Sequence, residues 1–248
     1  MVWGAPLAVR GQAAVEAALT LPLVVFMLLG TLQLFLVMQG RILAQYAAFR
    51  AVRAGVVNHG DCRVMSDAAL GALLPSLSRT DDPARVVAAF AKRSFANQYK
   101  YTGGDEDSGH TGQVFWLDRQ PILGVGVEQK DFDQSDANGA GGAPTRLEAQ
   151  LVFWFPMKIP FANWVMSRMF LAYFGIRSYT AQNPLMMTAP ARQGWRDVTV
   201  AGPAADIRTE LNRRVAAFEY DFPVIVSYSM RMMTPVRTPF PVQCPRYP

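Results

Sequence analysis

The chain has 248 residues, of which 51% are hydrophobic and 17% are charged. The hydrophobic share is high and the charged share low for a soluble domain, which favours a chain with a membrane segment, and the 11% aromatic content excludes a disordered chain. The net charge of +5 is spread along the chain, with adjacent pairs only at Lys92-Arg93 and Arg213-Arg214. We interpret it as a solvated basic surface and expect no nucleic-acid partner, with weak attraction to anionic headgroups as the alternative.

Residues 13–37 form an apolar run that contains a single charge, Glu16, and the next charge is Arg41. A helix that crosses a bilayer needs about 20 apolar residues, whereas the apolar core of a cleaved secretory signal is about 7–15 residues long. No A-x-A-like site follows the run. The sequence therefore predicts a transmembrane helix over residues 12–40.

The charges that flank this helix do not set its orientation. Arg10 precedes it and Arg41, Arg50 and Arg53 follow it, so the positive-inside rule favours neither side. Glu16 needs an explanation, because a carboxylate deep in a bilayer costs about 2.5–3.5 kcal/mol. Either it pairs with an amine, as it would one turn from a new N-terminus, or it reaches the membrane surface from the first helical turn.

The run RGQAAVEAALTLPLVVFMLLG, residues 10–30, resembles the pilin-like signal of TadE-like proteins, which belong to tight-adherence (Tad) pilus systems. This resemblance implies that a prepilin peptidase cuts after Gly11 on the cytoplasmic side. Gln12 then becomes the first mature residue and Glu16 the fifth, and residues 1–11 form a cytoplasmic leader. Pro22 lies in a Leu-Pro-Leu step that such segments often carry, and its missing donor predicts a helix kink.

Two features separate the chain from the short major Tad pilins. Ala17 follows Glu16 where those pilins usually have an aromatic residue, and this chain is far longer. The resemblance therefore implies a minor pilin or pseudopilin. Its expected place is the bacterial inner membrane, single-pass, with its C-terminal domain outside the cytoplasm. Its expected partners are other pilin-like subunits, the pilus assembly machinery and the peptidase that cuts it.

Residues 41–58 are expected to continue the helix as a stalk. Ile42, Tyr46 and Phe49 recur at helical spacing, with Val52 and Val56 nearby, and predict an apolar face that packs on the domain.

Residues 59–248 are expected to form an extracytoplasmic α+β domain with an antiparallel sheet. Helices are predicted over residues 66–74, stopped near Pro75, over residues 83–99, capped by Asp82, and over residues 204–218. Val86, Val87, Phe90 and Phe95 are expected to be the buried face of the second of these. Predicted strands cover residues 114–118, 122–128, 147–155, 177–182, 198–200 and 222–230.

Residues 161–176 form an apolar segment with two interpretations. A second membrane helix would be short and would carry Arg168 at its centre. The alternative, which we prefer, is a short amphipathic helix that lies on the domain or on the membrane.

The chain has two cysteines, Cys62 and Cys244. Outside the cytoplasm such a pair can form a disulfide, and this one would close a very long loop. Spacing alone leaves both the bonded and the free state open.

No motif of an enzyme active site is present, and with two histidines no histidine cluster can bind a metal. His59 and His110 are predicted to be surface loop residues. The acidic stretches at residues 105–107 and 131–138 lack the spacing of a calcium loop. We therefore expect no catalytic residue, no metal and no cofactor.

Three functions fit the sequence to different degrees. The first is a minor pilin or pseudopilin that acts in assembly or stabilisation of a Tad-type pilus, and so in adhesion. The second is an uncleaved, single-pass, membrane-anchored binding module. The third, an exported enzyme on a membrane tether, would need a site assembled from residues distant in sequence.

Overall fold

The computed structural model describes residues 9–94, 96, 98–101, 110–119, 146–176, 201–234 and 244, without the side chains of 9–13, 171–176 and 201–205. The helices are α1 (Val9–Val57), α2 (Cys62–Leu77), α3 (Pro83–Arg93), α4 (Ala162–Ile176) and α5 (Ala201–Ala216). The strands are β1 (Lys100–Tyr101), β2 (Gly112–Gln113), β3 (Phe115–Arg119), β4 (Arg146–Pro156) and β5 (Asp221–Arg231). The strands expected at 122–128, 177–182 and 198–200 lie outside the described residues, as does Phe95.

The fold is α+β, as the sequence predicts. Strands β3, β4 and β5 form an antiparallel sheet in that order, and β1 and β2 form a separate two-stranded ladder. In the centre of the sheet Leu151 on β4 is opposite Leu117 on β3 and Val226 on β5. The two long strands, β4 and β5, are paired along their whole length, which gives the domain its rigid middle layer.

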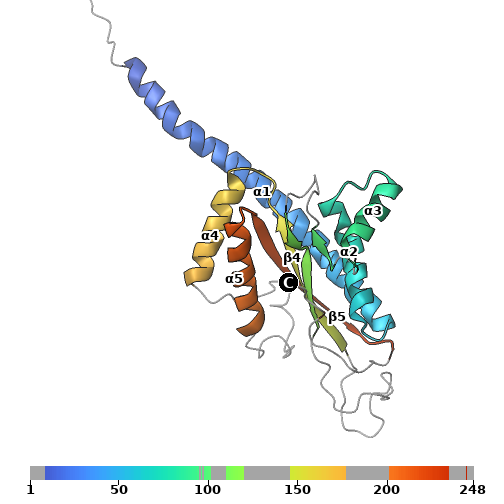
Figure 1. The fold of residues 1–248 in the computed structure, drawn as a ribbon. Helices are drawn as coiled ribbons and strands as arrows, with labels where there is room; N and C mark the ends of the chain where they lie inside the picture. The colour runs from blue at the N-terminus through green and yellow to red at the C-terminus, as the bar shows by residue number, and fades with distance from the viewer. Residues whose placement is uncertain are drawn as a thin grey trace, which may run out of the picture.

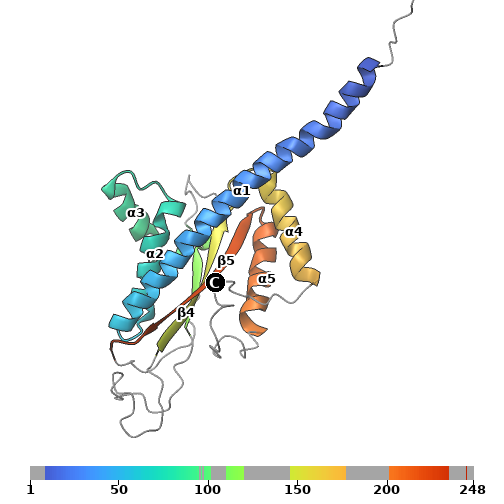
Figure 2. The ribbon, with the colours of Figure 1, turned by 180° about the vertical axis from the view of Figure 1, so that it is seen from behind.

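Helices cover both faces of this sheet. The C-terminal half of α1, together with α2, lies on one face, and α5 and α4 lie on the other (Figures 1 and 2). The larger core lies between α1, α2 and the sheet, and the smaller core between α5 and the opposite sheet face. The N-terminal half of α1 extends away from both cores (Figure 1).

The face of α1 that packs on the domain is only in part the one predicted. Val52 and Val56 are buried, as expected, but Ile42 and Tyr46 are 66% and 49% exposed. The other buried residues of this face are small: Ala44, Ala47, Ala48 and Ala51. The helix touches α2 as well as the sheet, and alanines let both come close. Gly40 and Gly55 continue this surface of small residues. A Cβ at Gly40 would lie 2.5 Å from the Phe155 ring, and a Cβ at Gly55 would lie 2.6 Å from the Leu147 side chain.

Helices α2 and α3 begin at aspartate caps. Asp61 accepts a 2.8 Å hydrogen bond from the Arg63 N–H, and Asp82, as predicted, accepts one of 3.0 Å from the Ala84 N–H. The expected stop at Pro75 is wrong: α2 runs through it to Leu77. A proline removes one helical hydrogen bond, and the packing of Leu73, Leu74 and Leu77 outweighs that loss.

Three expectations in α3 and α5 are corrected. Helix α3 ends at Arg93 rather than near residue 99, and Val87 is 68% exposed rather than buried. Helix α5 ends at Ala216, and Phe218, expected on its buried face, is 80% exposed at a φ of 59°. The chain must turn back there to start β5, which takes Phe218 off the helix face.

Candidate functional site

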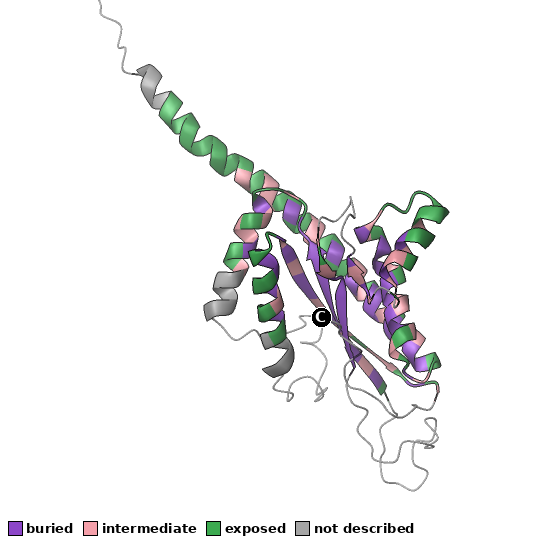
Figure 3. Cartoon of the chain, viewed as in Figure 1, coloured by how far each residue is buried: buried purple, intermediate pink, exposed green. Residues whose placement is uncertain are grey.

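Helix α1 has two halves with different surroundings. Up to Val25 its described side chains are exposed on every side, whereas from residue 44 onward one face is buried in the domain (Figure 3). The exposed residues of the first half are large and apolar, among them Leu19, Leu21, Leu23, Val24, Met27 and Leu28. Among the described residues α1 is the one helix long and apolar enough to cross a membrane, and α4, with 15 residues, is too short.

The residues of the expected cleavage signal lie in the first turns of α1. Gly11 and Gln12 are part of the helix, which begins at Val9. The side chain of Glu16 is exposed. The helix continues through Pro22. The Thr20 hydroxyl donates a 2.8 Å hydrogen bond to the Glu16 carbonyl, four residues back.

Specific contacts join α1 to the domain at two places along the helix. At the place nearer the N-terminus, the rings of Phe26 and Phe161 meet edge to face with centroids 5.7 Å apart, and Gln33 is fully buried. The Gln33 Oε1 atom accepts a 3.0 Å hydrogen bond from the Ile159 N–H. The domain therefore begins to cover α1 at Phe26, well inside the apolar run.

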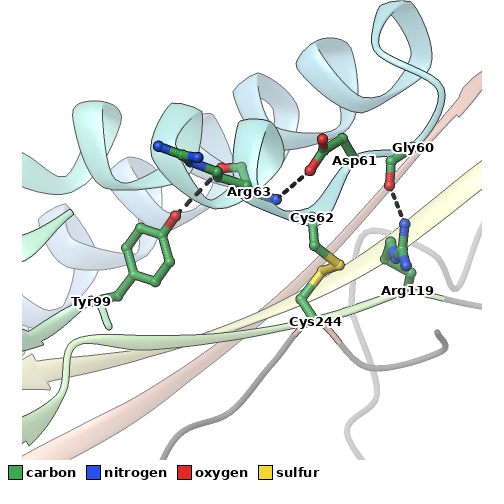
Figure 4. Close-up of a disulfide and its surroundings, with 7 residues drawn as sticks. All are labelled: Gly60, Asp61, Cys62, Arg63, Tyr99, Arg119 and Cys244. Atoms are coloured by element: carbon green, nitrogen blue, oxygen red, sulfur yellow. Dashed lines mark hydrogen bonds between the residues drawn. A yellow bond between two sulfur atoms is a disulfide. The ribbon is translucent and has the colours of Figure 1, made fainter. Parts of the chain in front are cut away.

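At the second place, the C-terminal end of α1 is hydrogen-bonded to the C-terminal part of the chain. The Met233 N–H and the Thr234 hydroxyl both donate to the Val56 carbonyl, at 3.1 and 2.9 Å. Just beyond, Cys62 and Cys244 form a disulfide across a sequence separation of 182 residues (Figure 4). The Cys244 N–H donates to the Leu117 carbonyl at 3.2 Å, so the tail also reaches the sheet edge at β3.

Two polar side chains flank the disulfide (Figure 4). The Arg119 guanidinium donates to the Gly60 carbonyl, and burial lowers its pKa to about 10 although the charge of Asp61 opposes this. The Tyr99 hydroxyl donates to Asp67 at 3.1 Å, and its pKa is raised, first by burial and then by the Asp67 charge. These contacts hold α2 and the turn before it in place, and the disulfide leaves neither cysteine as a free thiol.

A buried ion-pair network lies at the opposite end of the sheet. The Arg214 side chain is fully buried, donates to Asp221, and donates to Glu210 and the Gln113 carbonyl at 2.7 Å each. Burial raises the pKa of Asp221, and the Arg214 charge acts in the other direction. This network joins α5, β5 and the short β1–β2 ladder.

His110 is part of the same network, so its prediction as a surface loop residue is wrong. Its side chain is 11% exposed, and its Nδ1 atom lies 3.1 Å from the Asp221 Oδ1 atom. Ligand atoms of His110, Glu219 and Asp221 lie within 4.8 Å of one another, in a combination of donors that suits zinc. Arg214 already neutralises Asp221, however, and Glu219 accepts from the Thr111 N–H at 2.9 Å, so we treat the group as a structural network.

The chain was then compared with known proteins. Residues 11–53 match the family model of TadE-like proteins. The TadE-like segment thus begins at the predicted cleavage glycine and covers the apolar run and most of the stalk, which confirms the resemblance over these residues. It connects the chain with the Tad pilus in general terms. Comparison with curated proteins and with solved structures gives no match.

The sequence identifies the TadE-like segment but not the contacts that the domain makes with it. Gln33 is the one amide within the apolar run, and that isolated polar residue was a signal of a partner. The His110–Asp221 contact had no such signal, because the two residues are far apart in sequence and meet only through the β1–β2 ladder and β5.

Proposed function

We propose that this chain is a TadE-like minor pilin or pseudopilin. A prepilin peptidase cuts it after Gly11, α1 then anchors it in the inner membrane with the domain outside the cytoplasm, and it acts in the assembly or stabilisation of a Tad-type pilus. The chain is a substrate of the peptidase and has no enzymatic role of its own.

The observation that carries this proposal is the uncovered half of α1. A soluble domain does not expose a helix that is apolar on all sides, because each such residue loses the free energy of burial. The same segment matches TadE-like proteins and has Glu16 one turn after the proposed new N-terminus at Gln12. Bilayer lipid covers the helix before assembly, and neighbouring pilin helices cover it in a filament.

The test is the mature N-terminus, determined by mass spectrometry on protein expressed in its host. We expect the wild type to start at Gln12. Gly11→Ala and a strain that lacks the prepilin peptidase should both leave the chain uncut. Glu16→Gln should be cut normally, because its carboxylate serves the pairing of subunits, and should be reduced in sheared surface filaments.

Each other result has a definite meaning. A wild-type chain that keeps residues 1–11 would leave the uncleaved, anchored binding module as the better function. A cut near residues 44–48 would mean a secretory signal and a domain released from the membrane. If Glu16→Gln assembled as well as the wild type, the pairing role of that carboxylate would be wrong.

A further inference from the structure

The domain covers α1 in the middle of its uncharged stretch. Phe26, whose ring meets that of Phe161, lies midway between Arg10 and Arg41. At about 1.5 Å per residue the helix rises about 24 Å from Arg10 to Phe26, and about 15 Å from Glu16. The hydrocarbon core of a bilayer is about 30 Å thick.

These lengths decide where the contact lies when α1 spans the membrane. With Arg10 at the cytoplasmic edge of the hydrocarbon, Phe26 is about 6 Å below the opposite edge, and with Glu16 there it is about 15 Å below. A tilted helix places it deeper still. Phe161 therefore enters the lipid in each of these placements.

We infer that the turn before α4 and the first turns of α4, residues 159–168, insert into the outer leaflet of the membrane that α1 crosses. This inference rests on the anchoring and orientation of the proposed function. The structure supports it in three further ways, through the side chains of this segment, the hydrogen bonds of its backbone and its backbone strain. We refer to residues 159–168 as the shoulder.

The exposed side chains of the shoulder are those of a membrane interface. Trp164 and Arg168 lie at i and i+4 on one face of α4, and Phe161 lies in the turn before the helix. All three are exposed, Phe161 by 55% and Trp164 by 47%. Lys158, just before the turn, is exposed as well. Aromatic rings settle at the boundary between lipid and water, and long basic side chains reach from it to the headgroups.

Several backbone N–H groups in the first part of the shoulder have acceptors within the protein, as lipid surroundings require. The Ile159 N–H donates to Gln33 of α1, and Pro160 has no N–H to satisfy. The Ala162 N–H donates to the Pro160 carbonyl at 2.8 Å, and the Trp164 N–H to the Asn163 Oδ1 atom at 2.7 Å. Gln33 thus supplies, from within the apolar run, the acceptor that the turn needs.

Backbone strain marks the same turn. Phe161 has a φ of 68°, a left-handed backbone conformation that is unfavourable for a bulky residue. The turn that requires it brings the Phe161 ring onto Phe26. α4 then leaves α1 at an angle, beside α5 (Figures 1 and 2), so the shoulder is the part of α4 next to the apolar run.

The test uses a fluorescent reporter on the full-length chain in vesicles. The dye NBD is attached to Trp164→Cys, while the two native cysteines remain in their disulfide. The vesicles contain phosphatidylethanolamine and phosphatidylglycerol, with or without bromine on the acyl chains. Two matched positions on α1 serve as controls: Leu28→Cys in the apolar run, and Arg53→Cys, exposed at the far end of the same helix.

We expect brominated lipid to quench the dye at position 164 by about the same fraction as at position 28, with no quenching at position 53. Quenching at 28 but not at 164 would overturn the inference and leave the anchor intact. No quenching at 28 would instead contradict the anchoring itself. A blue-shifted dye at 164 that lipid does not quench, with cross-links between copies, would show that a second chain covers the shoulder and would also overturn the inference.

Discussion

The Arg214 guanidinium lies over the Trp154 ring, with its Cζ atom 4.5 Å from the ring centroid, and both side chains are fully buried. Alternation along β4 places Trp154 with Glu148 and Gln150, on the face opposite Leu151 and Phe153, and this pattern predicts that their face is exposed to solvent. That face is covered by α5, and Trp154 packs there against Trp116. The Arg214 guanidinium therefore contacts the Trp154 ring and its two carboxylate partners, Glu210 and Asp221.

Replacing this arginine tests how much the domain depends on the network. Arg214→Met leaves Asp221 buried without its arginine partner, and loss of one member of a buried pair costs about 3–5 kcal/mol of unfolding free energy. The matched control is Arg213→Met, whose side chain is 53% exposed and also bonds Glu210 at 2.6 Å. We expect it to cost less than about 1 kcal/mol. Urea unfolding of the full chain in detergent measures both, and equal losses would contradict the assignment.

Close packing at Gly40 gives a second prediction. A Cβ there would lie 2.5 and 2.8 Å from two carbons of the Phe155 ring, which is 7% exposed and has little room to move. Gly40→Ala is therefore expected to destabilise the domain by about 1–3 kcal/mol. Gly30→Ala, on the same helix with no atom within 4 Å of its Cβ, is the control and should leave the domain unchanged. A stabilised Gly40→Ala protein would mean that helix and sheet can separate there at no cost.

The disulfide should stabilise the domain chiefly through the length of the loop that it closes. The double variant Cys62→Ser, Cys244→Ser is expected to lose about 2–5 kcal/mol of unfolding free energy, because the unfolded chain regains the entropy of a very long loop. Dithiothreitol should produce the same loss in the wild type and no change in the double variant. An unchanged wild type under reduction would show that the contacts of Val56 with Met233 and Thr234 hold the tail by themselves.

The lowered pKa of Glu210 predicts that the stability of the domain depends on pH. Burial raises its pKa, but the hydrogen bonds and charges of Arg213 and Arg214 lower it further, so that the net value is below the ordinary 4.5. The stability that it contributes is therefore complete above about pH 4.5 and is lost as the pH falls through the folded value.

The measurement compares the wild type with Glu210→Gln by urea unfolding at several pH values. The difference in unfolding free energy should be constant above about pH 4.5 and should shrink below it. Asp221, whose pKa is raised, acts with the opposite sign, but it is present in both proteins and does not affect the difference. A difference that widens toward acid pH would mean that burial, rather than the arginines, controls Glu210.

Features carried by neighbouring residues could be predicted from the sequence. The apolar run of α1, the Asp82-Pro83 start of α3, and the alternation of Leu147, Leu151 and Phe153 on one face of β4 each depend on local chemistry. The β5 strand and the α+β class follow in the same way. So does the TadE-like segment, because its Gly11, Gln12 and Glu16 lie within a few residues of one another.

Local sequence patterns did not determine which side chains pack against each face of a helix or strand. Bulky residues indicate a buried face only where there is room, and α1 packs so closely on α2 and the sheet that alanines are buried there while Ile42 and Tyr46 are exposed. Trp154 is buried because α5 covers a face that alternation alone assigns to solvent. The sequence by itself determined a long apolar helix and its TadE-like segment. Only the tertiary structure decided that the domain meets that helix at Phe26 and Gln33, because that contact joins residues more than a hundred positions apart.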